Sequence, residues 1–211
     1  MRKFNKLIIA CDGESASGKS TAAKLVSKKY KLLLINSGLL YRYSSKLVMV
    51  HEPKNIISFL SKKFRNASYK KISSQNLHSE KISNHVAILA KNKKVREIIN
   101  RFQNKIIQNN KKICVEGRDI ASKILAKKPK YDLAFYFKCN LEIASQRRWV
   151  DIKKKVPLKE VKRSLNKRTL MDKKRKYSPL KKVKDAILIK TDKFNKKQVL
   201  SIMSKYIDKI N

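Results

Sequence analysis

Short apolar runs alternate with amphipathic stretches along much of the chain. Short apolar runs bounded by polar residues are typical of buried strands, whereas apolar residues recurring every three or four positions are typical of helices. The pattern predicts strands at 7–10, 32–35, 112–115, 133–137 and 186–189, and helices at 20–30, 41–50, 141–150 and 197–210. Because the strands alternate with helices, we predict a parallel sheet in an α/β fold.

Two segments interrupt this alternation. Residues 52–75 are polar and weakly periodic, and residues 151–178 are heavily charged, with helical propensity but without a strong apolar stripe. Segments that bury little apolar surface are the ones that move most easily. We therefore interpret both segments as inserts that close over a substrate.

The charge of the chain is strongly unbalanced. The 211 residues include 54 lysines and arginines against 15 aspartates and glutamates, which gives a formal net charge of +39. Such a surface attracts polyanions, so nucleic-acid binding is one possible function. Only 11 of the basic residues are arginines, and the lysines are spread over every segment. This distribution favours a general lysine bias, with nonspecific attraction of nucleic acid, over a specific nucleic-acid site.

The cysteines and the N-terminal region exclude several other classes. Cys11, Cys114 and Cys139 are far apart and form no C-x-x-C pair, so neither a disulfide framework nor a zinc site is indicated. We expect them to be small buried apolar residues. The apolar run 7–11 is far too short for a signal sequence or a membrane span. We therefore predict a cytoplasmic protein without membrane association.

The first functional motif lies between the first predicted strand and the first predicted helix. The segment 13–20 reads G-E-S-A-S-G-K-S and matches the G-x-x-x-x-G-K-[S/T] pattern of a phosphate-binding loop. In such a loop, backbone N–H groups hold phosphates at a helix N-terminus, Lys19 reaches the β- and γ-phosphates, and the Ser20 hydroxyl ligates Mg²⁺. The predicted ATP-binding residues are Gly13, Glu14, Ser15, Ala16, Ser17, Gly18, Lys19, Ser20 and Thr21.

Further motifs follow the loop in a fixed order over nearly the whole chain. They are N-S-G-L-L-Y-R at 36–42, Ser83-Asn84, Val95-Arg96, V-E-G-R-D-I at 115–120, and Arg168, Asp172 and Arg175 followed by S-P-L at 178–180. Together they resemble the motifs of the bacterial cytidylate kinases, which are P-loop nucleoside monophosphate kinases. The resemblance implies a P-loop kinase fold with a five-stranded parallel sheet flanked by helices. It also implies a core at 1–37, 106–146 and 179–211, an acceptor-binding insert at 38–105 and a mobile lid at 147–178.

The resemblance implies transfer of the γ-phosphoryl group of ATP to CMP or dCMP. By resemblance, Arg42 and Arg118 hold the acceptor phosphate. Asp172 resembles a sugar contact, and Arg168 resembles a lid residue that meets the transferring phosphate. The candidate catalytic residues are thus Lys19, Arg118 and Arg168. The residues that resemble cytosine contacts are Ser37, Arg96, Asp119 and Arg175.

The arginines and the chemistry of the acceptor agree with this assignment. Five of the 11 arginines fall on motif positions, in a chain whose usual cation is lysine. Arginine is preferred where a planar fork must grip a phosphate or a base edge. A phosphate acceptor with a second pKa near 6 is already ionised at neutral pH, so the reaction needs positive charge and alignment instead of a general base.

Several positions depart from the family pattern or allow a second interpretation. Ala87 replaces a serine near the nucleotide sugar, Met171 replaces a lid arginine, and Glu14 adds a negative charge to the phosphate loop. Ala87 leaves the preference between CMP and dCMP open. Asp119 is alternatively a helix cap, and Asp172 a solvated carboxylate beside a lysine. Asp12 either orders the waters of Mg²⁺ or stabilises a turn.

Other functions remain open at this point. Another P-loop small-molecule kinase acting on UMP, AMP or shikimate shares the phosphate loop, as does an ATPase or GTPase switch. A basic RNA-binding protein is a further, less favoured alternative. Because no long apolar stripe is expected on the surface, we predict a monomer.

Overall fold

The computed structural model describes residues 4–210, apart from the side chain of Glu80. The chain forms two compact units. The first consists of Met1–Ile35 together with Asn110–Asn211, and the second consists of Asn36–Asn109.

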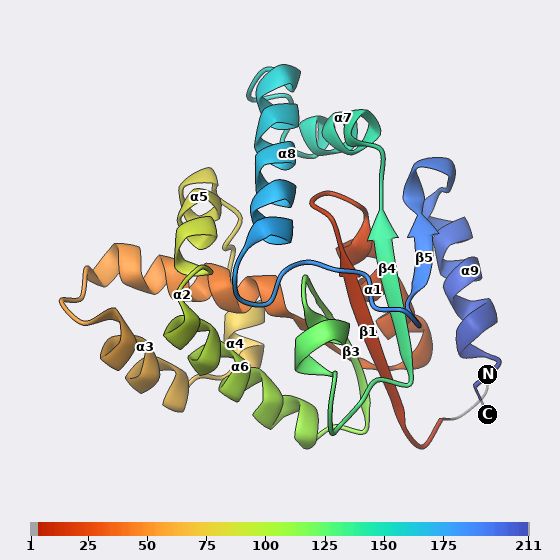
Figure 1. The fold of residues 1–211 in the computed structure, drawn as a ribbon, viewed down its shortest axis with the longest axis horizontal. Coiled ribbons are helices and arrows are strands. Elements are labelled where there is room, and N and C mark those ends of the chain that lie inside the picture. The colour runs from red at the N-terminus through yellow and green to blue at the C-terminus, as the bar shows by residue number, and fades with distance from the viewer. Residues whose placement is uncertain (1–3, 211) are drawn as a thin grey trace. The chain divides into compact units, whose positions relative to one another are not determined.

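The first unit is built on the predicted sheet, and all of the predicted strands are present (Figure 1). The strand order is β2-β3-β1-β4-β5, and β1 pairs in parallel with β3 and β4, as does β4 with β5. The prediction of a five-stranded parallel sheet is confirmed. The strands are β1 (Leu7–Gly13), β2 (Leu33–Asn36), β3 (Lys112–Gly117), β4 (Leu133–Lys138) and β5 (Ile187–Lys190).

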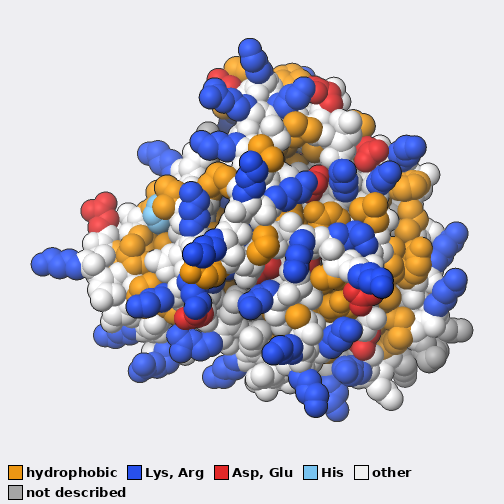
Figure 2. Space-filling model, in the orientation of Figure 1, with side chains coloured by type: hydrophobic (Ala, Val, Ile, Leu, Met, Phe, Trp, Pro, Cys, Tyr) orange, Lys and Arg blue, Asp and Glu red, His pale blue; other side chains and the backbone are white. Residues whose placement is uncertain are grey.

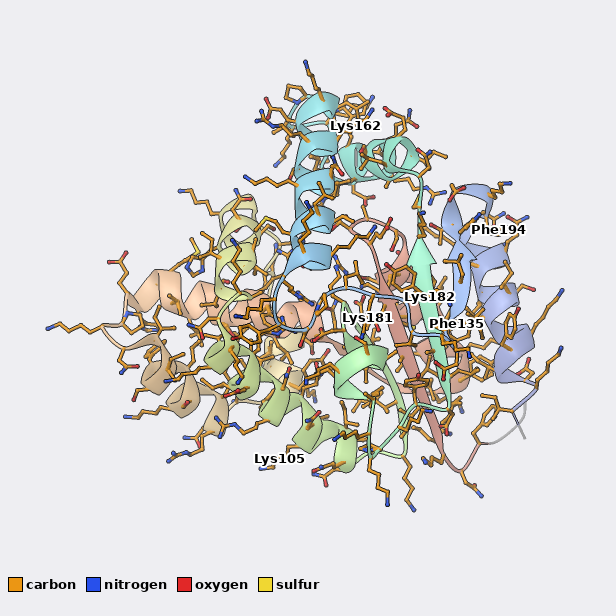
Figure 3. The ribbon with its side chains drawn as sticks, viewed as in Figure 1. Lys105, Phe135, Lys162, Lys181, Lys182 and Phe194 are labelled. Carbon is orange, nitrogen blue, oxygen red and sulfur yellow. The ribbon has the colours of Figure 1, made fainter. Side chains whose placement is uncertain are left out.

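One face of the sheet forms a core with two helices. Alternate β1 residues Leu7, Ile9 and Cys11 point to this face, as the two-residue period of a strand requires. They belong to one buried cluster with residues of α1 (Lys19–Tyr30) and α9 (Lys196–Ile207). Phe135 of β4, labelled in Figure 3, meets Tyr206 of α9 edge to face, with the ring centroids 6.4 Å apart.

The cysteines behave as predicted. Cys11, Cys114 and Cys139 are all buried and unpaired by disulfides. The Cys11 and Cys114 sulfurs are 3.8 Å apart on neighbouring strands. This contact, followed by burial, raises the pKa of the Cys11 thiol, so Cys11 stays protonated.

The charged segment after β4 folds into two helices that bury little. These are α7 (Leu141–Asp151) and α8 (Leu158–Lys174), and Val161 is the buried residue of α8. Lys162 of α8 forms an ion pair with Glu142 of α7 (Figure 3). The interpretation of 151–178 as a helical segment with a small buried surface agrees with the structure. Two short helices complete the unit, the π-helix η1 (Ile120–Ile124) and the 3-10 helix η2 (Thr191–Lys193).

The second unit is entirely helical and has its own core. Its helices are α2 (Ser37–His51), α3 (Ile56–Arg65), α4 (Tyr69–Ser73), α5 (Glu80–Leu89) and α6 (Lys93–Gln108). The expectation that residues 52–75 bury little was wrong, because Leu60, Phe64 and Ile72 are buried in this core. The apolar residues of α3 at 56, 57, 59, 60 and 64 have the spacing of an amphipathic helix, which the interpretation of the segment as weakly periodic overlooked, whereas the five-residue α4 is too short to show a period.

Among the residues that the structure describes, no helix combines the length and the apolar character that a bilayer-crossing segment needs.

Candidate nucleotide-binding site

The phosphate loop connects β1 to α1, and its two glycines are required by its geometry. A Cβ atom on Gly13 would lie 2.5 Å from the carbonyl oxygen of Phe137, so only glycine fits against β4. Gly18 has φ of +77°, a left-handed conformation that glycine adopts without strain. The loop backbone is thus fixed by the sequence motif itself and leads directly into the N-terminus of α1.

Thr191, which follows β5, binds the backbone of the phosphate loop. The Thr191 hydroxyl donates to the Ser17 carbonyl at 2.9 Å, and the Thr191 carbonyl accepts from Arg147 Nη2 at 3.0 Å. The sequence motifs did not identify Thr191, because its partner lies 174 positions earlier in the chain. This contact stabilises the loop conformation that a nucleotide would use.

The buried Glu116 contacts the side chains of Lys19 and Ser20 at the start of α1. Lys19 Nζ forms an ion pair with Glu116, and Ser20 Oγ donates to Glu116 Oε2 at 2.7 Å. Glu116 is 1% exposed, and its other oxygen, Oε1, is buried without a hydrogen-bond partner among the described residues. Glu116 lies within the V-E-G-R-D-I motif, but the sequence analysis assigned it no role. Glu116 lies near the end of a strand that pairs with β1, and this position could have indicated that its side chain lies near the phosphate loop.

Ser20 and Glu116 form a set that fits Mg²⁺. Hydroxyl and carboxylate oxygens are the ligands that this ion prefers, and it is usually held by one or two such groups together with substrate phosphates and water. The described residues contain no cluster of three or more His, Cys, Asp or Glu side chains that would form an all-protein metal cage. The free Oε1 of Glu116 is the kind of buried acceptor that a metal ion or its water would satisfy.

Asp12 anchors the loop that follows β3. Its two carboxylate oxygens accept the backbone N–H groups of Ile120 and Ala121, each at 2.8 Å. Burial raises the pKa of Asp12 to about 6, although both backbone hydrogen bonds act in the opposite direction. Of the two interpretations of Asp12, these contacts favour the structural one. Asp12 thereby fixes the backbone that carries Arg118 and Asp119.

Motif residues that are far apart in the sequence meet in a network of arginines and carboxylates. Arg118 Nε donates to Asp172 Oδ2 at 2.9 Å, and Arg175 Nη1 donates to Asp172 Oδ1 at 3.2 Å. Arg175 Nη2 lies 3.6 Å from Asp119 Oδ1. Asp172 therefore pairs with two arginines, in contrast to the alternative that it is a solvated partner of a lysine. Asp119 stands at the N-cap of η1, but its side chain makes no capping hydrogen bond.

Helix α8 and Arg118 also reach the phosphate loop. Arg118 Nη2 lies 3.5 Å from Ser15 Oγ, and the Ser15 N–H donates to Thr169 Oγ1 at 3.4 Å. Arg168 precedes Thr169 on α8 and is half-buried. The first unit thus brings the phosphate loop, Arg118 and the C-terminal half of α8 together.

The remaining predicted residues, Ser37, Arg42 and Arg96, lie in the second unit. Arg42 is buried, and its Nη1 donates to Ser83 Oγ at 2.8 Å and to the Leu77 carbonyl at 3.3 Å. Arg96 is buried with its guanidinium carbon 5.4 Å from the centre of the Tyr41 ring. Arginine guanidinium groups suit the binding of anionic phosphate groups. Ser37 is buried in the first turn of α2.

Comparison with known proteins assigns the chain to a family. The family model described as cytidylate kinase matches residues 9–209. The chain belongs to the cytidylate kinase family. A curated cytidylate kinase from Mesomycoplasma hyopneumoniae strain 7448 is 31% identical over 224 residues, covering 97% of this chain and 94% of the relative. Family membership makes the chain a phosphotransferase with a phosphate group as acceptor.

Solved structures share the fold of this cytidylate kinase family member. An uncharacterized protein from Eubacterium ventriosum has a TM-score of 0.58 at 19% identity and covers 97% of this chain and 99% of its own. The shikimate kinase from Bacteroides thetaiotaomicron has a TM-score of 0.51 at 9% identity, with 96% and 98% covered. At these identities the likeness establishes a P-loop kinase fold and carries no information on the acceptor.

Proposed function

We propose that the chain is a (d)CMP kinase that transfers the γ-phosphoryl group of ATP to CMP or dCMP, giving (d)CDP and ADP. The observation that carries the proposal is the meeting of Arg118, Asp119, Asp172 and Arg175 beside the phosphate loop of the first unit. Membership of the cytidylate kinase family supports the same reaction.

The phosphate loop is the proposed ATP site. Its backbone N–H groups and Lys19 bind the phosphates, and the positive end of α1 favours their charge. Ser20 and Glu116 would hold Mg²⁺, which neutralises charge on the β- and γ-phosphates when it is bound. Glu116 also keeps Lys19 oriented, because the two side chains form a buried ion pair.

The proposed acceptor contacts follow from side-chain chemistry. Asp119 accepts hydrogen bonds from the cytosine amino group, and Arg175 donates to the base, assisted by Ser37 and Arg96. Arg42 and Arg118 bind the acceptor phosphate. Asp172 binds the sugar. Residues 38–105 form the acceptor-binding insert in this proposal, and 147–178 form a mobile lid that excludes water.

Catalysis in this proposal rests on charge and alignment. The acceptor phosphate is ionised at neutral pH and attacks without a general base. Lys19, Arg118 and Arg168 stabilise the negative charge on the transferring phosphoryl group. Arg118 is already held by Asp172, so little reorganisation is needed when substrates bind.

The decisive experiment measures ADP formation from ATP and Mg²⁺ with CMP, dCMP, UMP, AMP and shikimate in turn. Moderate salt suppresses nonspecific attraction of anions to the basic surface. Turnover confined to CMP and dCMP would support the proposal. Turnover with UMP, AMP or shikimate instead would show that the chain is another P-loop small-molecule kinase.

We also propose a cytoplasmic monomer that serves pyrimidine nucleotide metabolism, since ATP and CMP are metabolites of the cytoplasm. Basic side chains are spread over the visible face in Figure 2 and are not gathered in one patch. This distribution supports nonspecific attraction of nucleic acid over a dedicated nucleic-acid site. Loss of RNA binding at physiological salt is the expected result in a filter-binding titration.

A further inference from the structure

The phosphate loop carries an acidic side chain that pairs with α8. Lys173 Nζ lies 2.7 Å from Glu14 Oε1. The Glu14 side chain is 12% exposed and the Lys173 side chain is 43% exposed, so the pair is only partly shielded from water. Glu14 is thus held in a defined position, although it belongs to a loop that binds anions.

The same face of α8 makes a second contact with the loop. Thr169 and Lys173 are four positions apart and therefore lie on one side of the helix. Thr169 Oγ1 accepts the Ser15 N–H at 3.4 Å, next to the Glu14 pair. Two neighbouring loop residues are thus engaged by one side of α8.

Glu14 is unfavourable for nucleotide binding unless its charge is balanced. A carboxylate near the phosphates repels them, and Lys173 cancels this charge at the same point. Because α8 buries little apolar surface of its own, a single ion pair changes its docking equilibrium measurably.

We propose that Glu14 is a positioning residue that binds Lys173 and so holds α8 against the phosphate loop before ATP arrives. Bound ATP adds negative charge at the same loop and strengthens the hold on Lys173. The Glu14–Lys173 pair therefore lowers the KM for ATP. This consequence for KM rests on the proposed kinase function, whereas docking of α8 does not.

Hydrogen exchange of the α8 amides without nucleotide tests the docking step. Glu14→Gln and Lys173→Gln should each accelerate exchange in the C-terminal half of α8 about two- to five-fold, the effect of a partly exposed ion pair. Lys174→Gln is the matched control, because Lys174 is the exposed neighbour on the same helix. The differences should vanish in about 1 M salt, where the Debye length is about 3 Å.

A charge exchange tests whether the pair itself is responsible. Glu14→Lys and Lys173→Glu, each alone, place like charges together and should accelerate exchange. The combined Glu14→Lys/Lys173→Glu variant restores opposite charges and should return exchange toward the wild-type rate. Unchanged exchange in both single variants, or no recovery in the combined variant, would overturn the proposal.

Steady-state kinetics test the consequence for ATP. Lys173→Gln should raise the KM for ATP about two- to five-fold with kcat nearly unchanged, and Lys174→Gln should change neither. An equal effect of both variants would overturn the proposal. A wild-type chain that docks α8 but does not phosphorylate CMP would contradict the proposed function and leave the docking result intact.

Discussion

The phosphate loop and the arginine–carboxylate network are built in different ways. The loop is fixed by backbone and steric contacts, with Gly13 against Phe137 and the Ser17 carbonyl held by Thr191. The network consists of side-chain ion pairs among Arg118, Asp172 and Arg175. The conformation of the loop thus depends on its backbone, whereas the network depends on the identity of its side chains. Changes at the loop should therefore affect the binding of every nucleotide, whereas changes at Asp172 and Arg175 should affect mainly the acceptor.

The largest effect is expected from Lys19→Met, which removes the loop's cation. Loss of one charge-stabilising group in an active site lowers kcat by about 10²–10³-fold. The substitution also leaves the Glu116 carboxylate buried without its ion-pair partner. Steady-state kinetics with CMP would check the prediction, and Lys24→Met is the control, since Lys24 is exposed on the same helix. Retention of more than about a tenth of wild-type kcat would contradict the role of Lys19.

The buried carboxyl group of Asp12 should make the free energy of unfolding depend on pH. Its pKa is raised from 3.8 to about 6 by burial, so between these values the folded state holds a proton that the unfolded state has lost. The stability of the wild type relative to Asp12→Asn should therefore fall as pH rises from about 4 to about 6, by about 3 kcal/mol in total.

Urea unfolding of both chains at several pH values measures this difference. Above about pH 7 the difference should be constant, because Asp12 is then ionised in both states. A difference that rises between pH 4 and pH 6 would show that the two backbone hydrogen bonds outweigh burial.

Arg175→Met should distinguish most clearly between the role of the arginine–carboxylate network and the role of the phosphate loop. Arg175 contacts Asp172 and Asp119 in the network. Loss of a charged hydrogen-bonding group corresponds to about a 10- to 100-fold fall in kcat/KM for CMP. Calorimetric titration should give a Kd for ATP close to the wild-type value. Arg163→Met, at an exposed position of α8, is the control, and equal losses of ATP binding and CMP use would count against the role of Arg175.

The sequence was sufficient for those features whose determinants are local. The phosphate loop follows from residues within one short segment, and the strands follow from their apolar runs. Glu116 and Thr191 were missed because their partners lie 97 and 174 positions away, where spacing carries no signal. The role of Asp12 was left open for the same reason, since it binds backbone groups 108 and 109 positions later. Of the helices within 52–75, α4 is too short to show its period, whereas α3 carries an apolar stripe in the sequence that the interpretation of the segment as weakly periodic overlooked.

The smallest effect is expected from a substitution of Ala87 on α5, which should act through a single side-chain contact. Ala87 follows Ser83 by four positions on α5, so both lie on one side of that helix. Ala87→Ser adds a hydroxyl there, and one neutral hydrogen bond contributes about 0.5–1.5 kcal/mol. If that hydroxyl meets the ribose, kcat/KM for CMP relative to dCMP should rise about two- to ten-fold, while the KM for ATP stays constant. Competition between CMP and dCMP in one reaction measures this ratio directly. An unchanged ratio would place residue 87 away from the sugar, and a changed KM for ATP would contradict the separation between the two regions.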